Sequence, residues 1–383
     1  MYQIDRARKE DIESLLSLYF SIYGDAYPLE LGTNRRVMME TILSPDNLWL
    51  VSRDTAKNTI AGSVVISIDR FNKIGKVQGL ATHPNYRGQG IAQDLIATGT
   101  NRILVEEKCV NSIYATSRTN AVGVQLVFLK NGFIPLGICP NAHKLKEYET
   151  LTLFAKFQKN ILSERKTRSF VPEKLAPIMQ VLGNHLNTNE VIDTVKSKKP
   201  VLAPACEIGT DFDVIFAPAY VKRKFNNTFT DAYDRFYPFH EPNTLIASED
   251  GELEVYANIN KNDQYCAIIS ITDSFKNIPH YMKRLLATLQ DYGASYVETI
   301  ISTSNIESIE VLLDAQFLPS AVYPAMQERN GNHMDFVLMS RTMKPLNFKG
   351  MEIASDFKPY VDQYVDLWKK MHIDTLEIFN EYT

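Results

Sequence analysis

Hydrophobic residues recur at two different spacings in the first eighty residues. Residues 11–23 and 35–43 place apolar side chains on one face of a helix. Residues 48–52, 60–69 and 76–82 form short apolar or alternating runs separated by turn residues, which is the pattern of β-strands. Residues 2–4 can form a first strand, so this part of the chain predicts a strand, two helices and then antiparallel strands.

Helices and strands alternate in the next eighty residues. A helix continues to about residue 107, a strand covers residues 112–116, and a second helix runs from the N-cap candidate Asn120 to Asn131-Gly132. Residues 151–157 alternate like a last strand. The order predicts a mixed α/β (α+β) fold with a mostly antiparallel central sheet flanked by helices.

A glycine-rich turn joins the last of the antiparallel strands to the following helix. The residues from Val77 to Ala92 read VQGLATHPNYRGQGIA, and Pro84 ends strand pairing because it has no N–H. Gly88 and Gly90 let the main chain approach a ligand closely, and the amides and dipole of a helix N-terminus attract negative charge. The turn is therefore predicted to hold an anion, a pyrophosphate above all.

The same residues resemble motif A of the GNAT acyl-CoA N-acyltransferase superfamily. The run Arg87-x-x-Gly90-x-Ala92 is similar to its pyrophosphate loop, and residues 81–84 are similar to the strand end before that loop. Residues 120–133 resemble the family's later helix and its Gly-Phe ending. The resemblance covers roughly residues 1–158. It implies transfer of an acyl group from acetyl-CoA or another acyl-CoA, the co-substrate, directly to an amine on a small molecule or peptide.

The resemblance also implies which groups would touch the co-substrate. Main-chain groups at the strand end would hold the pantetheine arm and polarise the thioester carbonyl, loop amides would hold the pyrophosphate, and one side chain before the later helix would touch the arm. The strand-end groups are those of Leu80, Ala81 and Thr82, and the loop amides are those of Arg87, Gly88, Gln89, Gly90, Ile91 and Ala92. The side chain before the later helix is Asn120, for which helix capping alone is an equally good interpretation.

Two positions depart from the family pattern, and both concern proton transfer. Phe128 would contact the co-substrate, and it stands at the position where many relatives carry a tyrosine that protonates the CoA thiolate. Residues 74–83 contain no carboxylate, whereas many relatives carry a glutamate there. The amine must still lose a proton. We consider His143 as the base and Tyr148 as a second candidate, with a merely solvated loop histidine and proton transfer through water as the alternatives.

The second half of the chain repeats the first, with three strand candidates at residues 244–248, 254–260 and 265–271. Residues 129–135 (LKNGFIP) return as residues 313–319 (LDAQFLP), whereas residues 272–278 (TDSFKNI) replace the glycine loop and carry an aspartate that would repel phosphate. We therefore predict a tandem GNAT-like protein with one CoA site. Its parts are a GNAT domain with the CoA site at 1–160, a linker with a helix at 161–200, a degenerate GNAT-like domain at 201–345 and a C-terminal helix at 346–383.

Composition narrows the remaining classes of function. The 383 residues are 45% hydrophobic and 22% charged, as in ordinary globular proteins of two domains. A net charge of −4 predicts neither nucleic acid nor an anionic membrane as partner, and no apolar run approaches the roughly 20 residues of a membrane helix. The four cysteines show no CxxC spacing, and residues 1–16 lack the apolar region of a signal peptide. We expect no metal and a cytoplasmic location.

Two functions other than N-acyl transfer stay open on the sequence. The missing tyrosine and glutamate suit a sensor or scaffold that binds a CoA thioester without turnover. The same site would also serve acyl transfer to an acceptor that is not an amine. CoA release that depends on an added amine distinguishes an enzyme from a sensor.

Overall fold

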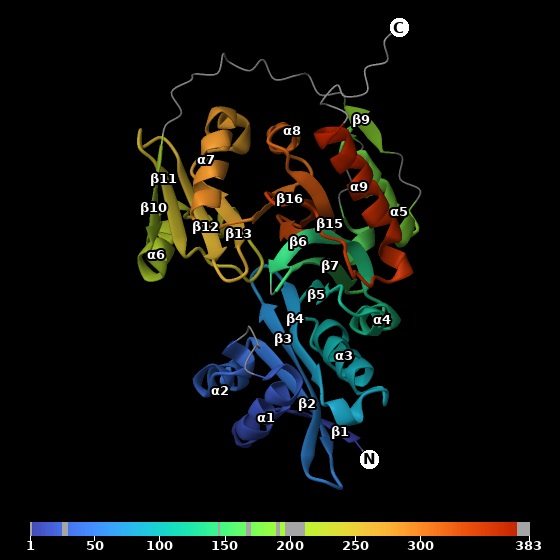
Figure 1. Ribbon diagram of the computed structural model, residues 1–383. Helices are drawn as coiled ribbons and strands as arrows, with labels where there is room; N and C mark the ends of the chain where they lie inside the picture. Colours follow the sequence, from blue (N-terminus) through green and yellow to red (C-terminus); the bar gives the residue numbers. More distant parts are fainter. Residues whose placement is uncertain are drawn as a thin grey trace. The chain divides into compact units, whose positions relative to one another are not determined.

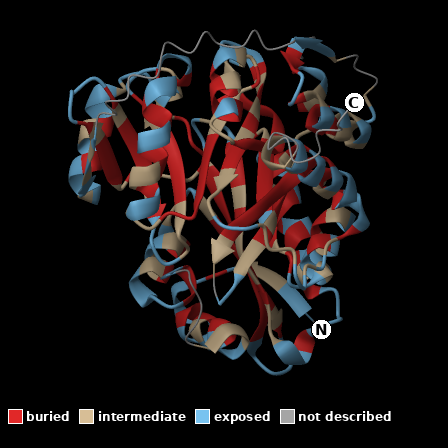
Figure 2. Ribbon diagram, turned by 45° about the horizontal axis from the view of Figure 1, so that its top comes forward, coloured by how far each residue is buried: buried red, intermediate tan, exposed pale blue. Residues whose placement is uncertain are grey.

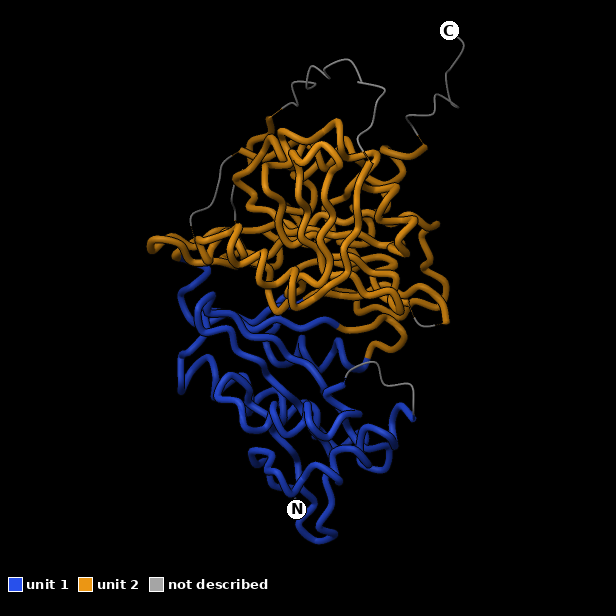
Figure 3. Tube along the Cα trace, turned by 90° about the vertical axis from the view of Figure 1, so that its left-hand side faces the viewer, with its two compact units in different colours: residues 1–116, 123–134, 154–163 blue, residues 117–122, 135–153, 164–383 orange. Residues whose placement is uncertain are grey.

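The computed structural model describes residues 2–24, 30–144, 146–165, 170–188, 192–195 and 211–373, which form two compact units (Figure 1, Figure 3). The first unit comprises residues 1–116, 123–134 and 154–163, and the second comprises residues 117–122, 135–153 and 164–383. Residues 196–210, at the predicted junction of linker and second domain, and residues 374–383 of the predicted C-terminal helix lie outside the described residues.

The first unit contains the strands and helices that the hydrophobic pattern predicts. In chain order they are β1 (Tyr2–Arg6), α1 (Ile12–Tyr23), α2 (Arg35–Leu43), β2 (Asn47–Asp54), β3 (Thr59–Asp69), β4 (Ile74–Thr82), α3 (Ile91–Asn101), β5 (Ser112–Arg118) and α4 (Val122–Lys130). A π-helical turn, Arg102–Glu106, continues α3 toward residue 107. The strand β7 (Tyr148–Phe157) carries residues of both units.

The sheet of the first unit has the strand order β1-β2-β3-β4-β5. Neighbouring strands from β1 to β4 are antiparallel, and β4 runs parallel to β5. The β4–β5 ladder contains the pairs from Ile74–Ser112 to Lys76–Tyr114 and then stops. The predicted mixed fold with a mostly antiparallel sheet is confirmed. Beyond Lys76, where β4 approaches the glycine loop, β4 is therefore no longer paired with β5.

Helices cover both faces of this sheet, and the buried side chains between them form its core (Figure 2). On one face, Leu15 and Tyr19 of α1 pack in a cluster with Trp49 of β2. On the other face, α3 lies so close to β3 that a Cβ at Gly62 would come within 2.6 Å of Ile91. Both helices therefore hold β3 and β4 in place, and the loop after β4 projects from a rigid base.

The strands of the second unit are hydrogen-bonded in the order β6-β15-β16-β14-β13-β12-β11-β10. The strand β13 is parallel to β14 over three pairs, from Tyr265–Tyr296 to Ala267–Glu298. The strands and helices of this unit are β6 (Ile134–Lys144), β8 (Phe170–Pro172), α5 (Ala176–Leu186), β9 (Asp193–Val195), β10 (Phe212–Phe216), α6 (Pro218–Thr228), β11 (Thr244–Ser248), β12 (Glu254–Asn260), β13 (Tyr265–Ile271), α7 (Pro279–Asp291), β14 (Tyr296–Ser302), α8 (Ile306–Asp314), β15 (Leu318–Arg329), β16 (Asn332–Thr342) and α9 (Lys358–His372).

The order of elements from β2 to β7 recurs from β11 to β16: three strands, a helix, a strand, a helix and two strands. That the second series is a degenerate copy of the first stays a prediction, as do the domain boundaries. One detail of the sequence interpretation was wrong. His143 does not lie in a loop but near the end of strand β6.

Candidate functional site

The glycine-rich turn forms an open cradle at the N-terminus of α3. A 3₁₀ turn, Pro84–Tyr86, precedes it, and the His83 imidazole accepts a 3.2 Å hydrogen bond from the Asn85 N–H. This bond gives His83 a structural role. Gly88 and Gly90 have φ values of +77° and +80°, a left-handed conformation that L side chains rarely adopt. The sequence contains glycine where the main chain requires it.

The cradle offers main-chain donors to an anion. Among the described residues, the N–H groups of Gly88, Gln89 and Gly90 have no hydrogen-bond partner. The N–H groups of the first helical turn, including those of Ile91 and Ala92, have no carbonyl partner within a helix. The α3 dipole adds partial positive charge at the same point. Arg87 through Gly90 are exposed, so these donors face solvent.

Tyr86 anchors the cradle to the turn between β2 and β3. Its ring is buried, and its hydroxyl lies 3.1 Å from Asp54 Oδ2 and 3.1 Å from Thr59 Oγ1. Tyr2 packs edge-on against the same ring and bonds to the side chain of Gln89. The loop is thus attached to the sheet before Gly88 and, through Gln89, between the two glycines.

The strand β4 contains a β-bulge just before the cradle. Gln78 pairs with Val65 and Ala81 pairs with Ser63, so Gly79 and Leu80 together lie opposite Val64. Leu80 and Thr82 are partly exposed, whereas Ala81 is 4% exposed. Because the β4–β5 ladder ends at Lys76, the main chain of residues 80–82 has no β5 ladder partner in the described structure.

The bulge rests on a buried network that the sequence analysis missed. Tyr19 of α1 donates a 2.7 Å hydrogen bond to the Gly79 carbonyl, and its hydroxyl also lies 3.4 Å from Ser63 Oγ. Ser63 Oγ accepts a 2.7 Å bond from Trp49 Nε1. An isolated glycine inside a strand pattern is the sequence signal that would have indicated this bulge.

Asn120 and Phe128 lie at the two ends of the later helix. Asn120 is exposed, belongs to the second unit and precedes the first residue of α4 by two positions. Phe128 belongs to the first unit, is 2% exposed and packs against Phe133 and Phe154 at ring distances of 5.0 and 5.3 Å. Phe128 therefore contributes to the core beneath α4.

The two proton-transfer candidates lie close to one another in the second unit. His143 Nδ1 is 3.1 Å from Asp263 Oδ1, and the imidazole is 16% exposed. The Tyr148 hydroxyl lies 2.5 Å from Gln264 Oε1, in the same turn between β12 and β13, and 3.2 Å from Ser295 Oγ. Both side chains are positioned by polar partners rather than simply solvated.

Cys139, which lies on β6 four residues before His143, does not suit nucleophilic chemistry. It is 6% exposed, in a cluster with Ala142 and Tyr296. Burial raises the pKa of the Cys139 thiol well above its usual value, and the nearby Glu298 carboxylate raises it further. The thiolate, which is the nucleophilic form, is therefore suppressed.

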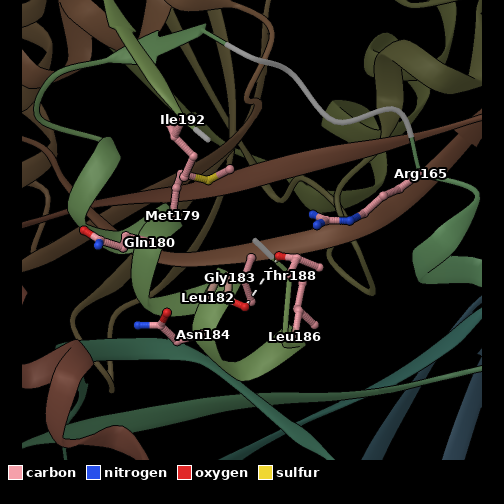
Figure 4. A pocket seen from close by; sticks show the side chains of 9 residues that line it. All are labelled: Arg165, Met179, Gln180, Leu182, Gly183, Asn184, Leu186, Thr188 and Ile192. Carbon is pink, nitrogen blue, oxygen red and sulfur yellow. Dashed lines mark hydrogen bonds between the residues drawn. The ribbon is translucent and has the colours of Figure 1, made fainter. Parts of the chain in front are cut away.

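The described residues of the second unit enclose a cavity apart from the predicted site residues. The cavity, of about 240 Å³, lies in the second unit between α5, Thr188 and Arg165 (Figure 4). It contains none of the predicted site residues, and Arg165 pairs with Asp335 at 3.1 Å. Within the described ranges, no three His, Cys, Asp or Glu side chains are grouped to hold a metal, and no helix is long and apolar enough to cross a membrane.

Comparison with known proteins gives one family match. Residues 10–133 match the model of the acetyltransferase (GNAT) family, and no curated protein matches the chain. Among solved structures, similarity is found to a GNAT-family acetyltransferase from Streptococcus pneumoniae (16% identity, TM-score 0.37, 41% of this chain and 99% of that one). It is also found to the ribosomal-protein-S5-alanine acetyltransferase from Vibrio fischeri (17%, 0.37, 42% and 94%) and to spermidine N-acetyltransferase from Vibrio cholerae with CoA and spermine (14%, 0.36, 41% and 95%). These structural similarities are weak, and the family model matches about a third of the chain.

Proposed function

We propose that this chain, whose residues 10–133 belong to the acetyltransferase (GNAT) family, transfers an acyl group from an acyl-CoA to an amine acceptor. Acetyl-CoA is the expected donor. The acceptor we propose is an amine on a small molecule or peptide. The free thiols of Cys109, Cys139 and Cys266 agree with a reducing compartment, and we keep the cytoplasm as the proposed location.

The observation that carries the proposal is the cradle and the adjoining open edge of β4. The unpartnered amides of residues 88–90 and the first turn of α3 form an anion site of the kind that binds pyrophosphate. The main chain of residues 80–82 adjoins it and lacks a β5 ladder partner. Pyrophosphate at the cradle and pantetheine along β4 would extend the thioester toward the bulge.

The reaction we propose is direct transfer. The neutral amine nitrogen attacks the thioester carbonyl carbon, negative charge develops on the carbonyl oxygen, and the C–S bond then breaks to release CoA as its thiolate. Main-chain N–H groups at the bulge would stabilise the oxygen. The amine proton leaves to a base, and the thiolate acquires a proton from water or an acid.

For proton transfer we propose His143 as the base, with Tyr148 beside it. The Asp263 carboxylate next to His143 would stabilise the imidazolium that forms when the base accepts a proton. Asn120 keeps its proposed contact with the pantetheine arm. We assign Phe128 no proton-transfer role, because its buried ring has no ionisable group and shapes the core under α4.

We further propose that the second series of elements is a degenerate copy without a CoA site. The parallel β13–β14 ladder and the element order support common descent. Residues 272–278 stand in the place of the glycine loop, and Ser274 Oγ in this segment lies 3.0 Å from the Oγ of Ser308, a residue of α8 that is 0% exposed. The Ser308 hydroxyl also accepts a 3.3 Å bond from the Lys276 N–H. An inward-facing serine thus uses a loop amide that a phosphate would need.

A second candidate function is a sensor that binds a CoA thioester without turnover. Two observations favour it: Phe128 offers no proton, and the strand on which many members of the resembled family carry a glutamate has no carboxylate, only Gln78, whose amide donates a 2.8 Å bond to Ser67 Oγ. Both candidates share the cradle and differ only in proton transfer.

One experiment separates these functions. Calorimetric titration with CoA tests the cradle, and CoA release from acetyl-CoA is then followed with polyamines, amino acids and peptides as acceptors. Amine-dependent release identifies the enzyme. Tight CoA binding with no release for any acceptor identifies the sensor, and absence of CoA binding overturns both.

A further inference from the structure

Tyr19 reaches from α1 to the main chain of the β4 bulge. Its side chain is 1% exposed, and its hydroxyl donates to the Gly79 carbonyl oxygen at 2.7 Å. Residues 19 and 79 are far apart in the chain, and their contact lies wholly within the first unit. A buried phenol that bonds to a bulge carbonyl fixes the orientation of that peptide group.

The donors and acceptors of the network have a defined direction. The indole N–H of Trp49 can only donate, so Ser63 Oγ accepts it at 2.7 Å. Tyr19 has one proton, which goes to the Gly79 carbonyl, so the Ser63 proton points to the phenol oxygen at 3.4 Å. Burial raises the pKa of Tyr19 well above its usual value, so the phenol stays a donor.

Gly79 fits this contact only as glycine. Its φ is +62°, and a Cβ there would lie 2.8 Å from the Tyr19 hydroxyl and 3.0 Å from Leu31 Cδ2. The bulge, the left-handed glycine and the buried phenol therefore form one unit of structure.

We propose that Tyr19 is a positioning residue for the acyl donor, acting through the Gly79–Leu80 peptide. A trans peptide holds its C=O and N–H on opposite sides, so fixing the Gly79 carbonyl also fixes the direction of the Leu80 N–H. The bond to the carbonyl also polarises the peptide, which makes that N–H a better donor. The inference rests on the proposed function, in which the main chain from Leu80 onward meets the thioester.

The inference predicts that loss of the Tyr19 hydroxyl weakens the contact with the thioester carbonyl and leaves the binding of the rest of CoA unchanged. CoA lacks the acyl carbonyl, so the affinity ratio between acetyl-CoA and CoA reports on groups that meet that carbonyl. In Tyr19→Phe we expect CoA affinity to stay within about twofold, because the cradle is intact. We expect acetyl-CoA to lose its advantage over CoA, and kcat to fall roughly 5- to 30-fold with little change in KM for acetyl-CoA.

Tyr360 provides the matched control. Its side chain is 0% exposed, and its hydroxyl donates a 2.9 Å bond to the Pro135 carbonyl, all within the second unit. Tyr360→Phe removes the same kind of bond from a place that the proposal does not use. It should lower Tm comparably and leave the affinity ratio and kcat unchanged.

The experiment is calorimetric titration of the full chain with CoA and with acetyl-CoA, after circular dichroism has shown each variant to be folded. Wild-type protein that binds no CoA overturns the proposed function itself. Wild-type protein that binds both ligands equally, or a Tyr19→Phe protein that keeps the wild-type ratio, overturns the inference alone. If Tyr19→Phe does not fold, Ser63→Ala decides instead: a reduced ratio supports the inference and an unchanged ratio overturns it.

Discussion

The Tyr86 hydroxyl donates a 3.1 Å hydrogen bond to Asp54 Oδ2, which ties the residue before the glycine loop to the end of β2. The Tyr86 ring is 8% exposed and lies directly before Arg87 in the chain. A loop whose donors are main-chain amides depends on such anchors, because no side chain can correct the direction of a misplaced amide. Binding strength at the cradle should therefore depend on Tyr86.

The first prediction concerns this anchor. Tyr86→Phe keeps the ring and removes the bonds to Asp54 and Thr59, so we expect a loss of about 1 kcal/mol of stability. CoA affinity should fall several-fold, because the loop amides lose their fixed direction. Titration with CoA measures the change. Tyr256→Phe is a suitable control, since it removes a phenol bond to the Glu254 carboxylate in the second unit. Unchanged CoA affinity in Tyr86→Phe would count against the anchor.

The second prediction tests the cradle itself. Gly90→Val places a branched side chain at φ +80°, at a strain cost of about 1–2 kcal/mol, and moves the amides of the helix start. We expect CoA affinity to fall more than roughly tenfold while the protein stays folded. Gly251→Val is the matched control: φ is +76°, no atom lies within 4 Å of its Cβ position, and the turn follows β11. Equal CoA affinity in the two variants would refute the cradle assignment.

The cradle could be predicted from the sequence because its determinants are local. Proline cannot continue a strand, glycines permit left-handed φ, and the helical pattern begins at Ile91, so a few adjacent residues specify the geometry. The strands β11, β12 and β13 were predictable for the same reason. Alternation and turn residues lie next to each other in the chain.

The support beneath the cradle could not be predicted in the same way. Tyr19 and Gly79 meet only because α1 packs on the sheet, and a helical pattern says which face is buried but not which carbonyl its phenol will reach. The position of His143 was missed for another reason. Pro140 has no N–H to donate to a sheet, yet β6 meets β15 at Gly137, three residues earlier, so the missing N–H is not needed for that pair.

The third prediction concerns the base. His143→Ala should lower kcat more than tenfold and remove the acidic limb of the pH–rate profile, because the amine proton loses its acceptor. Asp263→Asn, which removes the carboxylate 3.1 Å from the imidazole, should also lower kcat, since the protonated ring loses its partner. The measurement is kcat against pH for acetyl-CoA and the best acceptor. An identical profile in His143→Ala would assign the proton to water or to another group.

The last prediction is that one CoA saturates each chain. The loop at residues 272–278 has no glycine, and the exposed Asp273 carboxylate, held by a 2.8 Å bond from Asn277, would repel a pyrophosphate. The buried Ser308 hydroxyl already accepts the Lys276 N–H, so that donor is lost to a ligand.

Calorimetric titration with CoA should therefore give a stoichiometry of one in the wild type, and Gly90→Val should leave no site with the wild-type affinity. Ser308→Ala frees the Lys276 N–H but leaves the Asp273 charge and supplies no glycine, so the stoichiometry should stay at one. Two bound CoA molecules in the wild type, or a site that keeps the wild-type affinity in Gly90→Val, would show that the second series of elements retains a CoA site.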